Sequence, residues 1–380
     1  MWEETTLAAH AEVTVGHVGP MATEYRDAGI PFLRSLNVRP HRIDWSDMKF
    51  IDPAFHERLR KSALAPGDVV TVRTGKPGQT AVIPAEIPVA NCSDVVVTRP
   101  GRTLDARWLS YQLNWLTDTH IAGYLVGAVQ QHFNVASAKA IKLLLPPLAE
   151  QHAIAEVLGA LDDKIAANER VAESADRLAR ATATSRLSND LIPLASVADI
   201  TMGSSPPGTS YNEAGEGEPF YQGVRDFGFR SPSKRVFTTA PVRMARPGDT
   251  LLSVRAPVGR VNVADQHLCL GRGLAGLRSR ESTPWTLLHQ VAAADAVWAP
   301  YNSEGTVFGA INKRAVGEAQ VPCVSLGNAD ALEAELSKLE ATIAAALAEA
   351  RLLAGTRDAL LPLLMSGRLW VNEATDLVVT

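Results

Sequence analysis

The chain has little cysteine, no long apolar run and almost no excess charge. Its three cysteines, Cys92, Cys269 and Cys323, are far apart and odd in number, which argues against a disulfide framework and suits a reducing compartment. No apolar run approaches the roughly 20 residues needed to span a bilayer. The first residues, MWEETTLAAH, lack the basic start and apolar centre of a signal peptide. We therefore expect a cytoplasmic protein that does not contact a membrane.

Motifs for catalysis and metal binding are also missing. The sequence has no HExxH and no CxxC pair, and its nine histidines lack ligand spacing, so we expect no metal and no catalytic residue on this chain. The string from Gly271 to Gly276, GRGLAG, does match GxGxxG. A dinucleotide site needs a helix to begin there, but the following residues 278–284, RSRESTP, disfavour one. We expect a strand and a turn without a cofactor.

The most informative feature that is present is an internal repeat. Residues 7–16 read LAAHAEVTVG and residues 194–203 read LASVADITMG, with five identical positions. Further matched pieces follow in the same order: Pro66-Gly67-Asp68 with Pro247-Gly248-Asp249, and Gly127-Ala128-Val129 and Asn134 with Gly305-Thr306-Val307 and Asn312. One module has been used twice, so we expect two similar surfaces that each do half of one job.

Each copy of the module is predicted to be a mixed α/β domain with a twisted sheet. Short β-branched runs bounded by turn residues predict strands at 69–72, 95–97, 250–254 and 261–263. Helical candidates follow at 106–117 and 285–296. We call residues 1–147 the first lobe and residues 189–326 the second lobe.

Two long helices are predicted between and after the lobes. Their seams keep steps of 4 and 3 residues, and this 3.5-residue period is typical of a coiled coil. The seam positions are Ile154, Leu158, Leu161, Ile165, Asn168, Ala172, Ala175 and Ala179 in the first helix, and Leu332, Leu336, Leu339, Ile343, Ala346, Ala350 and Leu353 in the second. Asn168 either fixes the register or marks a solvated break. If the helices pack antiparallel, the lobes lie at opposite ends of a spacer about 50 Å long, related by a pseudo-two-fold axis.

The charge is unevenly distributed. The net charge is −4, but the helical parts carry the negative excess and the lobes are nearly neutral. Arginine is the main cation of the lobes, and its planar guanidinium suits phosphate and guanine edges. The composition alone is weak support for nucleic-acid binding.

Several long strings resemble those of type I restriction–modification specificity subunits. They are LPPLAEQHAIAEVLGALDDKIAANERVAE (145–173), MGSSPPGTSYNEAGEGEPFYQG (202–223), PGDTLLSVRAPVGRVNVA (247–264), GTVFGAINK (305–313) and RDALLPLLMSGRL (357–369). The resemblance covers nearly the whole chain and is weakest between residues 17 and 60. In the first lobe, Leu33-Arg34-Ser35 stands where the second lobe has Tyr221-Gln222-Gly223.

The resemblance implies an α+β fold with two similar target-recognition domains, residues 1–147 and 189–326. They are separated by two long antiparallel coiled-coil helices, a central helix at 148–188 and a C-terminal helix at 327–370 followed by a tail at 371–380. The implied function is non-catalytic: the lobes read a split, asymmetric site in double-stranded DNA. The implied partners are two methylation subunits, which hold S-adenosylmethionine, and two restriction/translocase subunits.

Candidate DNA-binding residues are the cations and amides of the matched loops. They are Arg34, Asn37, Arg39, Arg73 and Lys76 in the first lobe, and Gln222, Arg225, Arg255 and Arg260 in the second. Arg73 and Arg255 are predicted to occupy equivalent places, beside Gly78 and Gly259. The seam residues Ile154 to Asn168 and Leu332 to Ile343 are the candidates for helix pairing and subunit docking. The alternatives are a methylation-only complex, a coiled-coil protein scaffold and an enzyme that uses the Gly271 loop.

Overall fold

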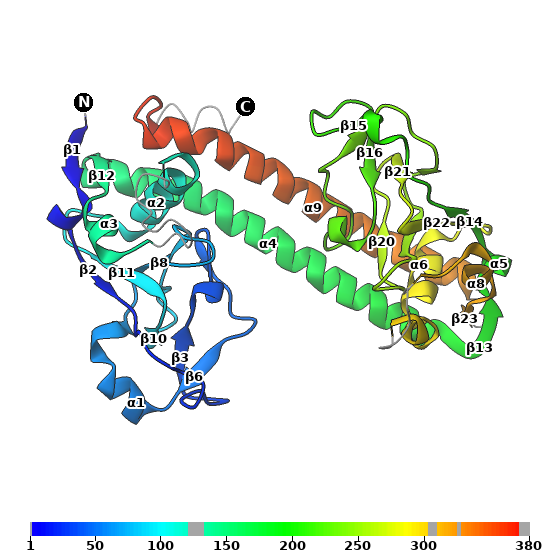
Figure 1. Ribbon diagram of the computed structural model, residues 1–380, viewed down its shortest axis with the longest axis horizontal. Helices are drawn as coiled ribbons and strands as arrows, with labels where there is room; N and C mark the ends of the chain where they lie inside the picture. Colours follow the sequence, from blue (N-terminus) through cyan, green and yellow to red (C-terminus); the bar gives the residue numbers. More distant parts are fainter. Residues whose placement is uncertain (1, 121–132, 303–309, 325–327, 372–380) are drawn as a thin grey trace. The chain divides into compact units, whose positions relative to one another are not determined.

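A computed structural model describes residues 2–120, 133–302, 310–324 and 328–371. The chain divides into two units, Met1–Ala167 with Glu349–Thr380, and Asn168–Ala348. Each unit therefore holds one lobe and a part of both long helices (Figure 1). Within the described ranges, no helix has the length and apolar content to cross a membrane. The repeat pieces 127–129 and 305–307 lie outside the described residues.

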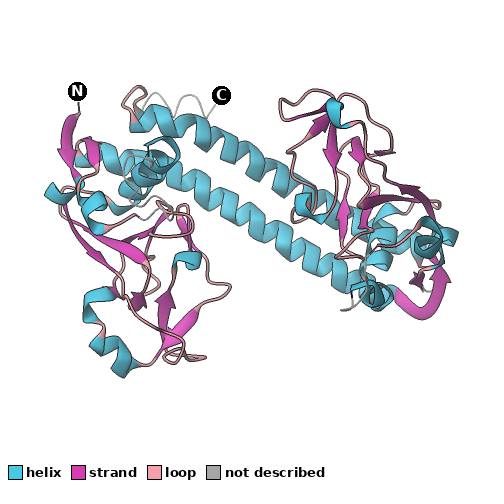
Figure 2. Cartoon of the chain, in the orientation of Figure 1, coloured by secondary structure: helices cyan, strands magenta, loops and turns pink. Residues whose placement is uncertain are grey.

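The described residues of the first lobe form two four-stranded sheets and two two-stranded ribbons, whose strands are drawn in magenta in Figure 2. One sheet has the order β2 (Ala11–Val15), β11 (Val95–Pro100), β8 (Val69–Val72), β9 (Thr80–Val82). The other has the order β6 (Lys49–Ile51), β3 (Ile30–Leu33), β10 (Ala90–Cys92), β7 (Ala63–Leu64). The remaining elements are the ribbons β1 (Glu3–Thr6) with β12 (Lys142–Leu145) and β4 (Val38–Arg39) with β5 (Arg42–Ile43), and the helices α1 (Pro53–Arg58), α2 (Ala106–His120) and α3 (Val135–Lys139).

The second lobe repeats the main features of this topology, with a fifth strand, β15 (Tyr211–Asn212), at the edge of its second sheet. Its first sheet has the order β14 (Ala198–Met202), β22 (Leu274–Ser279), β19 (Thr250–Ser253), β20 (Val261–Val263). Its second sheet has the order β15, β17 (Phe237–Thr238), β16 (Glu218–Tyr221), β21 (Leu268–Leu270), β18 (Met244–Ala245). The remaining elements are the ribbon β13 (Leu187–Pro193) with β23 (Gln320–Val324), and the helices α5 (Leu194–Val197), α6 (Pro284–Ala292), α7 (Asp295–Trp298) and α8 (Lys313–Glu318).

The matched sequence pieces have the same structural roles in both lobes. Asn134 caps α3 by accepting the Ser137 N–H at 2.9 Å, and Asn312 caps α8 by accepting the Ala315 N–H at 2.9 Å. An asparagine side chain at this position satisfies a backbone donor that the helix leaves unpaired. Gly67 and Gly248 share a φ of 86°, a left-handed turn that favours glycine. The predicted repeat is therefore confirmed at the level of individual turns and caps.

The sheet cores follow the two-residue alternation of a strand. In β11, Val95 and Val97 face the core between the two sheets, whereas Val96 faces the core that includes α2 and the long helices. The predicted strands at 69–72, 95–97, 250–254 and 261–263 are present. The predicted helix at 285–296 is instead two helices, α6 and α7, because the chain turns at Ala293-Ala294 and Asp295 begins a new helix.

The long helices α4 (Leu148–Arg186) and α9 (Ala329–Met365) pair in each unit with opposite direction. In the second unit, Ala172 and Ala175 pack with Ile343 and Ala346, and farther along α4 the alanines 179 and 183 pack with leucines 332 and 336. In the first unit, Arg357 binds Asp162 at 2.7 Å. As the residue number rises along α4 it falls along α9, so the predicted antiparallel seam is confirmed. Asn168 is 5% exposed, which places it inside the seam.

Candidate nucleic-acid interface

The second lobe carries a groove that gathers three of the predicted DNA-binding residues. Gln222, Arg225 and Arg255 line a hollow of about 670 Å³, together with Arg235, which the sequence analysis missed. The rest of the lining consists of Tyr211, Asn212, Glu213, Gly223, Val224, Asp226, Val236, Ala256 and Gly273. We call this hollow the second-lobe groove.

Gln222 is placed at the groove by the end of a strand. It directly follows β16, which pairs in parallel with β21. A Cβ on Gly273 would lie 2.1 Å from the Gln222 carbonyl oxygen, and a Cβ on Gly203 would lie 2.1 Å from the Gly271 carbonyl oxygen. Gly273, within the GxGxxG string, and Gly203, outside it, thus allow neighbouring backbone segments to approach closely. The string forms the turn that follows β21 and the first residues of β22, in agreement with the predicted strand and turn.

Asp226 is a buried residue of the groove lining that binds two other lining residues. Its side chain is 6% exposed, pairs with Arg235 at 3.2 Å and accepts the backbone N–H of Gln222 at 3.4 Å. Arg225 and Arg255 are exposed, and neither has an ion-pair partner among the described residues. Two guanidinium groups and one amide are therefore free to meet a ligand. Acceptor-rich base edges and phosphates suit such a donor set.

Arg260 and Arg272 are also exposed cations of the second lobe, but neither lines the groove. Arg260 lies in the turn between β19 and β20, where its backbone N–H donates to Ser253 Oγ at 2.9 Å. Arg272 donates to Ser205 Oγ at 3.1 Å. Arg235 could not be predicted as a groove residue from the sequence, because no residue of the first lobe was matched to it.

In the first lobe, Arg34 stands at the place of Gln222. Arg34 directly follows β3, which pairs in parallel with β10, as β16 pairs with β21. Its guanidinium pairs with the Asp47 carboxylate at 2.9 Å and lies 5.9 Å from the centre of the Tyr25 ring. The two lobes therefore offer different chemistry at one topological position: a neutral amide in the second and a paired, 18% exposed arginine in the first.

Asn37 has a different role from the one predicted. It is fully buried, its Oδ1 accepts the Arg34 N–H at 3.0 Å, and its Nδ2 donates to the Asp44 carbonyl at 3.0 Å. Both ends of the amide are used to close the turn at Ser35–Asn37. Asn37 is therefore a structural residue with no free hydrogen-bonding group for DNA.

The remaining first-lobe candidates are dispersed. Arg39 pairs with Asp44 at 3.3 Å, and hydrogen bonds from Ser46, followed by those from Arg39, lower the pKa of Asp44. Arg73 is half-buried after β8. Lys76 is exposed and lines another hollow, of about 440 Å³, with His41 and Arg357.

The predicted equivalence of Arg73 and Arg255 is wrong by one residue. The Arg73 carbonyl accepts the Phe133 N–H at 3.0 Å, and in the second lobe the Val254 carbonyl accepts the Ile311 N–H at 2.9 Å. Arg73 therefore corresponds to the buried Val254, whereas Arg255 corresponds to Thr74. This explains why Arg255 is exposed at the groove but Arg73 has a buried Nε.

The seam residues proposed for pairing and docking lie inside the chain. Most are less than 10% exposed, and Ile165 and Leu339 are half-buried. Ile154, Leu158 and Leu161 belong to the first-lobe core, and Leu332, Leu336 and Ile343 pack against alanines of α4. Any docking surface on the helices must therefore use other positions.

Comparisons with known proteins agree with this architecture. Residues 57–175 match the type I restriction modification DNA specificity domain. The chain is 26% identical to a Methanocaldococcus jannaschii protein named as the type I restriction enzyme MjaX specificity subunit, across 98% of this chain and 94% of that protein. The fold is similar to the crystal structure of a type I restriction–modification system S subunit from M. genitalium, with a TM-score of 0.64, 16% identity and 96% of each chain covered. The comparisons thus confirm the resemblance of this chain to type I restriction–modification specificity subunits.

Proposed function

We propose that this chain is the DNA sequence-specificity subunit of a type I restriction–modification complex and that each lobe reads one half of a split, asymmetric site. The observation that carries the proposal is the difference at one shared position: Gln222 follows β16 in the second lobe and Arg34 follows β3 in the first. Two copies of one scaffold with different donor groups suit two different half-sites. Half-sites on one face of a duplex lie about one helical turn, roughly 34 Å, apart.

The second-lobe groove supplies the donors that base reading requires. A glutamine amide can bind adenine bidentately and an arginine can bind guanine O6 and N7, each contributing about 1–3 kcal/mol of discrimination. Arg225 or Arg255 can equally hold phosphate, which positions the duplex without reading it. Because the lobes are nearly neutral, partner subunits would supply a share of the phosphate attraction.

The long helices are the proposed docking element for the partners. Val171 and Leu178 of α4 are 47% and 55% exposed, and their seven-residue spacing places them on one helix face. Exposed apolar side chains in register suit a protein partner. We assign methylation subunits, with S-adenosylmethionine on those subunits, and restriction subunits as the partners, and no catalytic step to this chain.

The test is the methylome of a host that expresses this chain with its cognate methylation subunit. We expect N6-methyladenine in both halves of a split motif, and exchanging residues 1–147 for another first lobe should change only one half. An unchanged methylome from a fully assembled complex would refute the proposal and favour a protein scaffold. Adding or omitting a translocase subunit in a cleavage assay separates a restriction complex from one that only methylates.

A further inference from the structure

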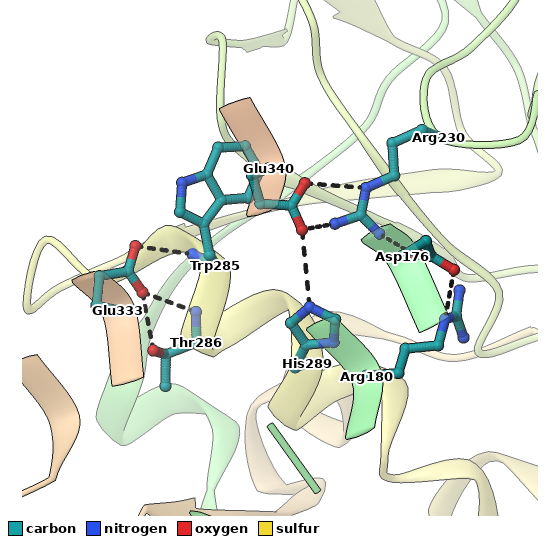
Figure 3. A network of polar contacts seen from close by, with 8 residues as sticks. All are labelled: Asp176, Arg180, Arg230, Trp285, Thr286, His289, Glu333 and Glu340. Carbon is teal, nitrogen blue, oxygen red and sulfur yellow. Dashed lines mark hydrogen bonds and ion pairs between the residues drawn. The ribbon is translucent and has the colours of Figure 1, made fainter. Parts of the chain in front are cut away.

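A buried arginine connects the second lobe to both long helices. Arg230, which lies between β16 and β17, donates from Nη1 to Asp176 of α4 at 2.9 Å and from Nε to Glu340 of α9 at 3.1 Å (Figure 3). Its Nη2 also binds Glu340. The three side chains are 11%, 8% and 3% exposed, respectively. One guanidinium thus bridges two helices at a place where water is largely excluded.

The surrounding charges balance this arginine. Asp176 also pairs with Arg180 at 2.8 Å, and Arg180 is 57% exposed. The His289 ring lies 3.7 Å from Glu340, as Figure 3 shows. Burial, reinforced by the charge of Arg230, lowers the pKa of His289 to about 4, so this ring is neutral near pH 7. Two carboxylates therefore face two guanidinium groups, without a surplus charge among these five residues.

Arg230 belongs to the loop that builds the second-lobe groove. Residues 222–236 contribute Gln222, Arg225 and Arg235 to the groove, and Arg230 lies between them in sequence. On its other side the loop is tied to β20, where the Arg230 carbonyl accepts the Val263 N–H at 3.0 Å and the Gly228 carbonyl accepts Asn262 Nδ2 at 2.9 Å. The groove loop is therefore held between the sheet and the helix pair.

Among its described residues, the first lobe has no arginine that bridges both helices: Arg107 pairs with Asp163 of α4 alone, at 3.4 Å. Gln151 of α4 accepts the N–H of Asp105, just before α2, and Glu333 of α9 accepts the N–H groups of Trp285 and Thr286 at the start of α6. The matched caps Asn134 and Asn312 are 178 positions apart, and so are the seam residues Leu158 and Leu336, which makes Asp162 of α4 the counterpart of Glu340. Asp162 accepts a hydrogen bond from the Tyr111 hydroxyl of α2 and pairs with Arg357 of α9 at 2.7 Å. The first lobe thus contacts this carboxylate through a hydroxyl group, whereas the second lobe contacts it through the Arg230 guanidinium.

The stability and the positioning that these ion pairs provide are separate contributions. Removing charges from water costs free energy, and a buried ion pair is often no more stabilising than apolar residues of similar size. What the ion pairs add is direction, because a planar guanidinium that binds two carboxylates fixes both distance and angle.

We propose that Arg230 is a positioning residue for DNA reading: its ties to Asp176 and Glu340 fix the groove loop 222–236 on the α4–α9 pair and so set the half-site specificity of the second lobe. This inference rests on the function proposed above. The first half-site does not depend on these ties.

The experiment uses the complete chain assembled with its methylation subunits. The wild-type methylome defines the motif, and methylation rates are then measured on duplexes with one mismatch in either half. The variant D176L/R230M/E340M replaces the charged trio by apolar side chains, which removes the directed ties without leaving an unpaired buried charge. We expect its discrimination in the second half to fall at least tenfold, with first-half discrimination and the unfolding temperature nearly unchanged.

Two further variants make the result decisive. R180A removes the exposed pair to the same Asp176 and should behave as wild type. R230K keeps the charge but cannot bind both carboxylates bidentately, so it should lose second-half discrimination and remain folded; it decides the question if the triple variant does not fold. Unchanged second-half discrimination in folded variants would overturn the inference. A wild-type methylome without a second-lobe half-site would instead overturn the proposed function.

Discussion

The pairing of the long helices depends on a few large side chains that face alanines. Ile343 of α9 is 1% exposed and packs with Ala172 and Ala175 of α4 and with Ala346. Ile343→Ala removes three carbons, which represents about 2.5 kcal/mol of lost burial at about 0.8 kcal/mol per methylene. Because alanines cannot move in to fill the space, a cavity term is added, and we expect a total loss of about 3–4 kcal/mol.

The assay is thermal unfolding of the full chain followed by far-ultraviolet circular dichroism. For a unit the size of Asn168–Ala348, each kcal/mol corresponds to about 2–4 °C, so we expect the transition that reports this unit to fall by about 10 °C. Ile343→Val should cost only about 0.5–1.5 kcal/mol. Leu178→Ala is the matched control, because Leu178 lies in the same unit but is 55% exposed, and it should change stability by less than about 0.5 kcal/mol. Equal effects of Ile343→Ala and Leu178→Ala would refute the seam.

Three other predictions concern the cap, the groove and pH. Glu333→Ala removes the acceptor for two N–H groups at the start of α6 and should cost about 1–3 kcal/mol in thermal unfolding, with Glu333→Gln costing less; equal losses would argue against a charged cap. Arg255→Ala should weaken duplex binding by the assembled complex and reduce the slope of log affinity against log salt by about 1, as measured by fluorescence anisotropy, whereas Asn37→Ala should lower stability instead. Since the pKa of His289 is about 4 when folded and 6.5 when unfolded, protons bind the unfolded chain more tightly, so stability is complete above about pH 6.5 and falls by up to about 3 kcal/mol as the pH drops towards 4. His289→Gln should flatten this dependence in denaturant titrations, leaving the part due to His41, whose pKa is also lowered to about 4 by burial.

Parts of the site could be predicted because they follow strand ends and turns. Gln222 directly follows β16, and Arg255 lies two residues after the end of β19. Loop positions of this kind meet at one edge of a sheet. Asn37 could not be separated from them, since an asparagine beside a strand end has the same donors and acceptors whether it reads a ligand or closes a turn. Only the hydrogen bonds of its amide distinguish the two roles.

The equivalence of Arg73 and Arg255 failed for a different reason. Arg73 lies five residues after Asp68, whereas Arg255 lies six residues after the matched Asp249. This offset of one residue moves a side chain from a buried to an exposed place at a strand end. The carbonyl partners Phe133 and Ile311 make the register unambiguous.

Local and periodic features were determined by the sequence alone: the repeated module, the strands, the two long helices, their seam and the resemblance to a family. They follow from side-chain periodicity and turn chemistry, which act over a few residues. Only the tertiary structure decided which cations are free, which are neutralised by a carboxylate distant in sequence, and that Arg230 joins Asp176 to Glu340 across more than a hundred residues of chain. Ion pairing and burial depend on distances in space, and no local pattern of residues encodes those distances.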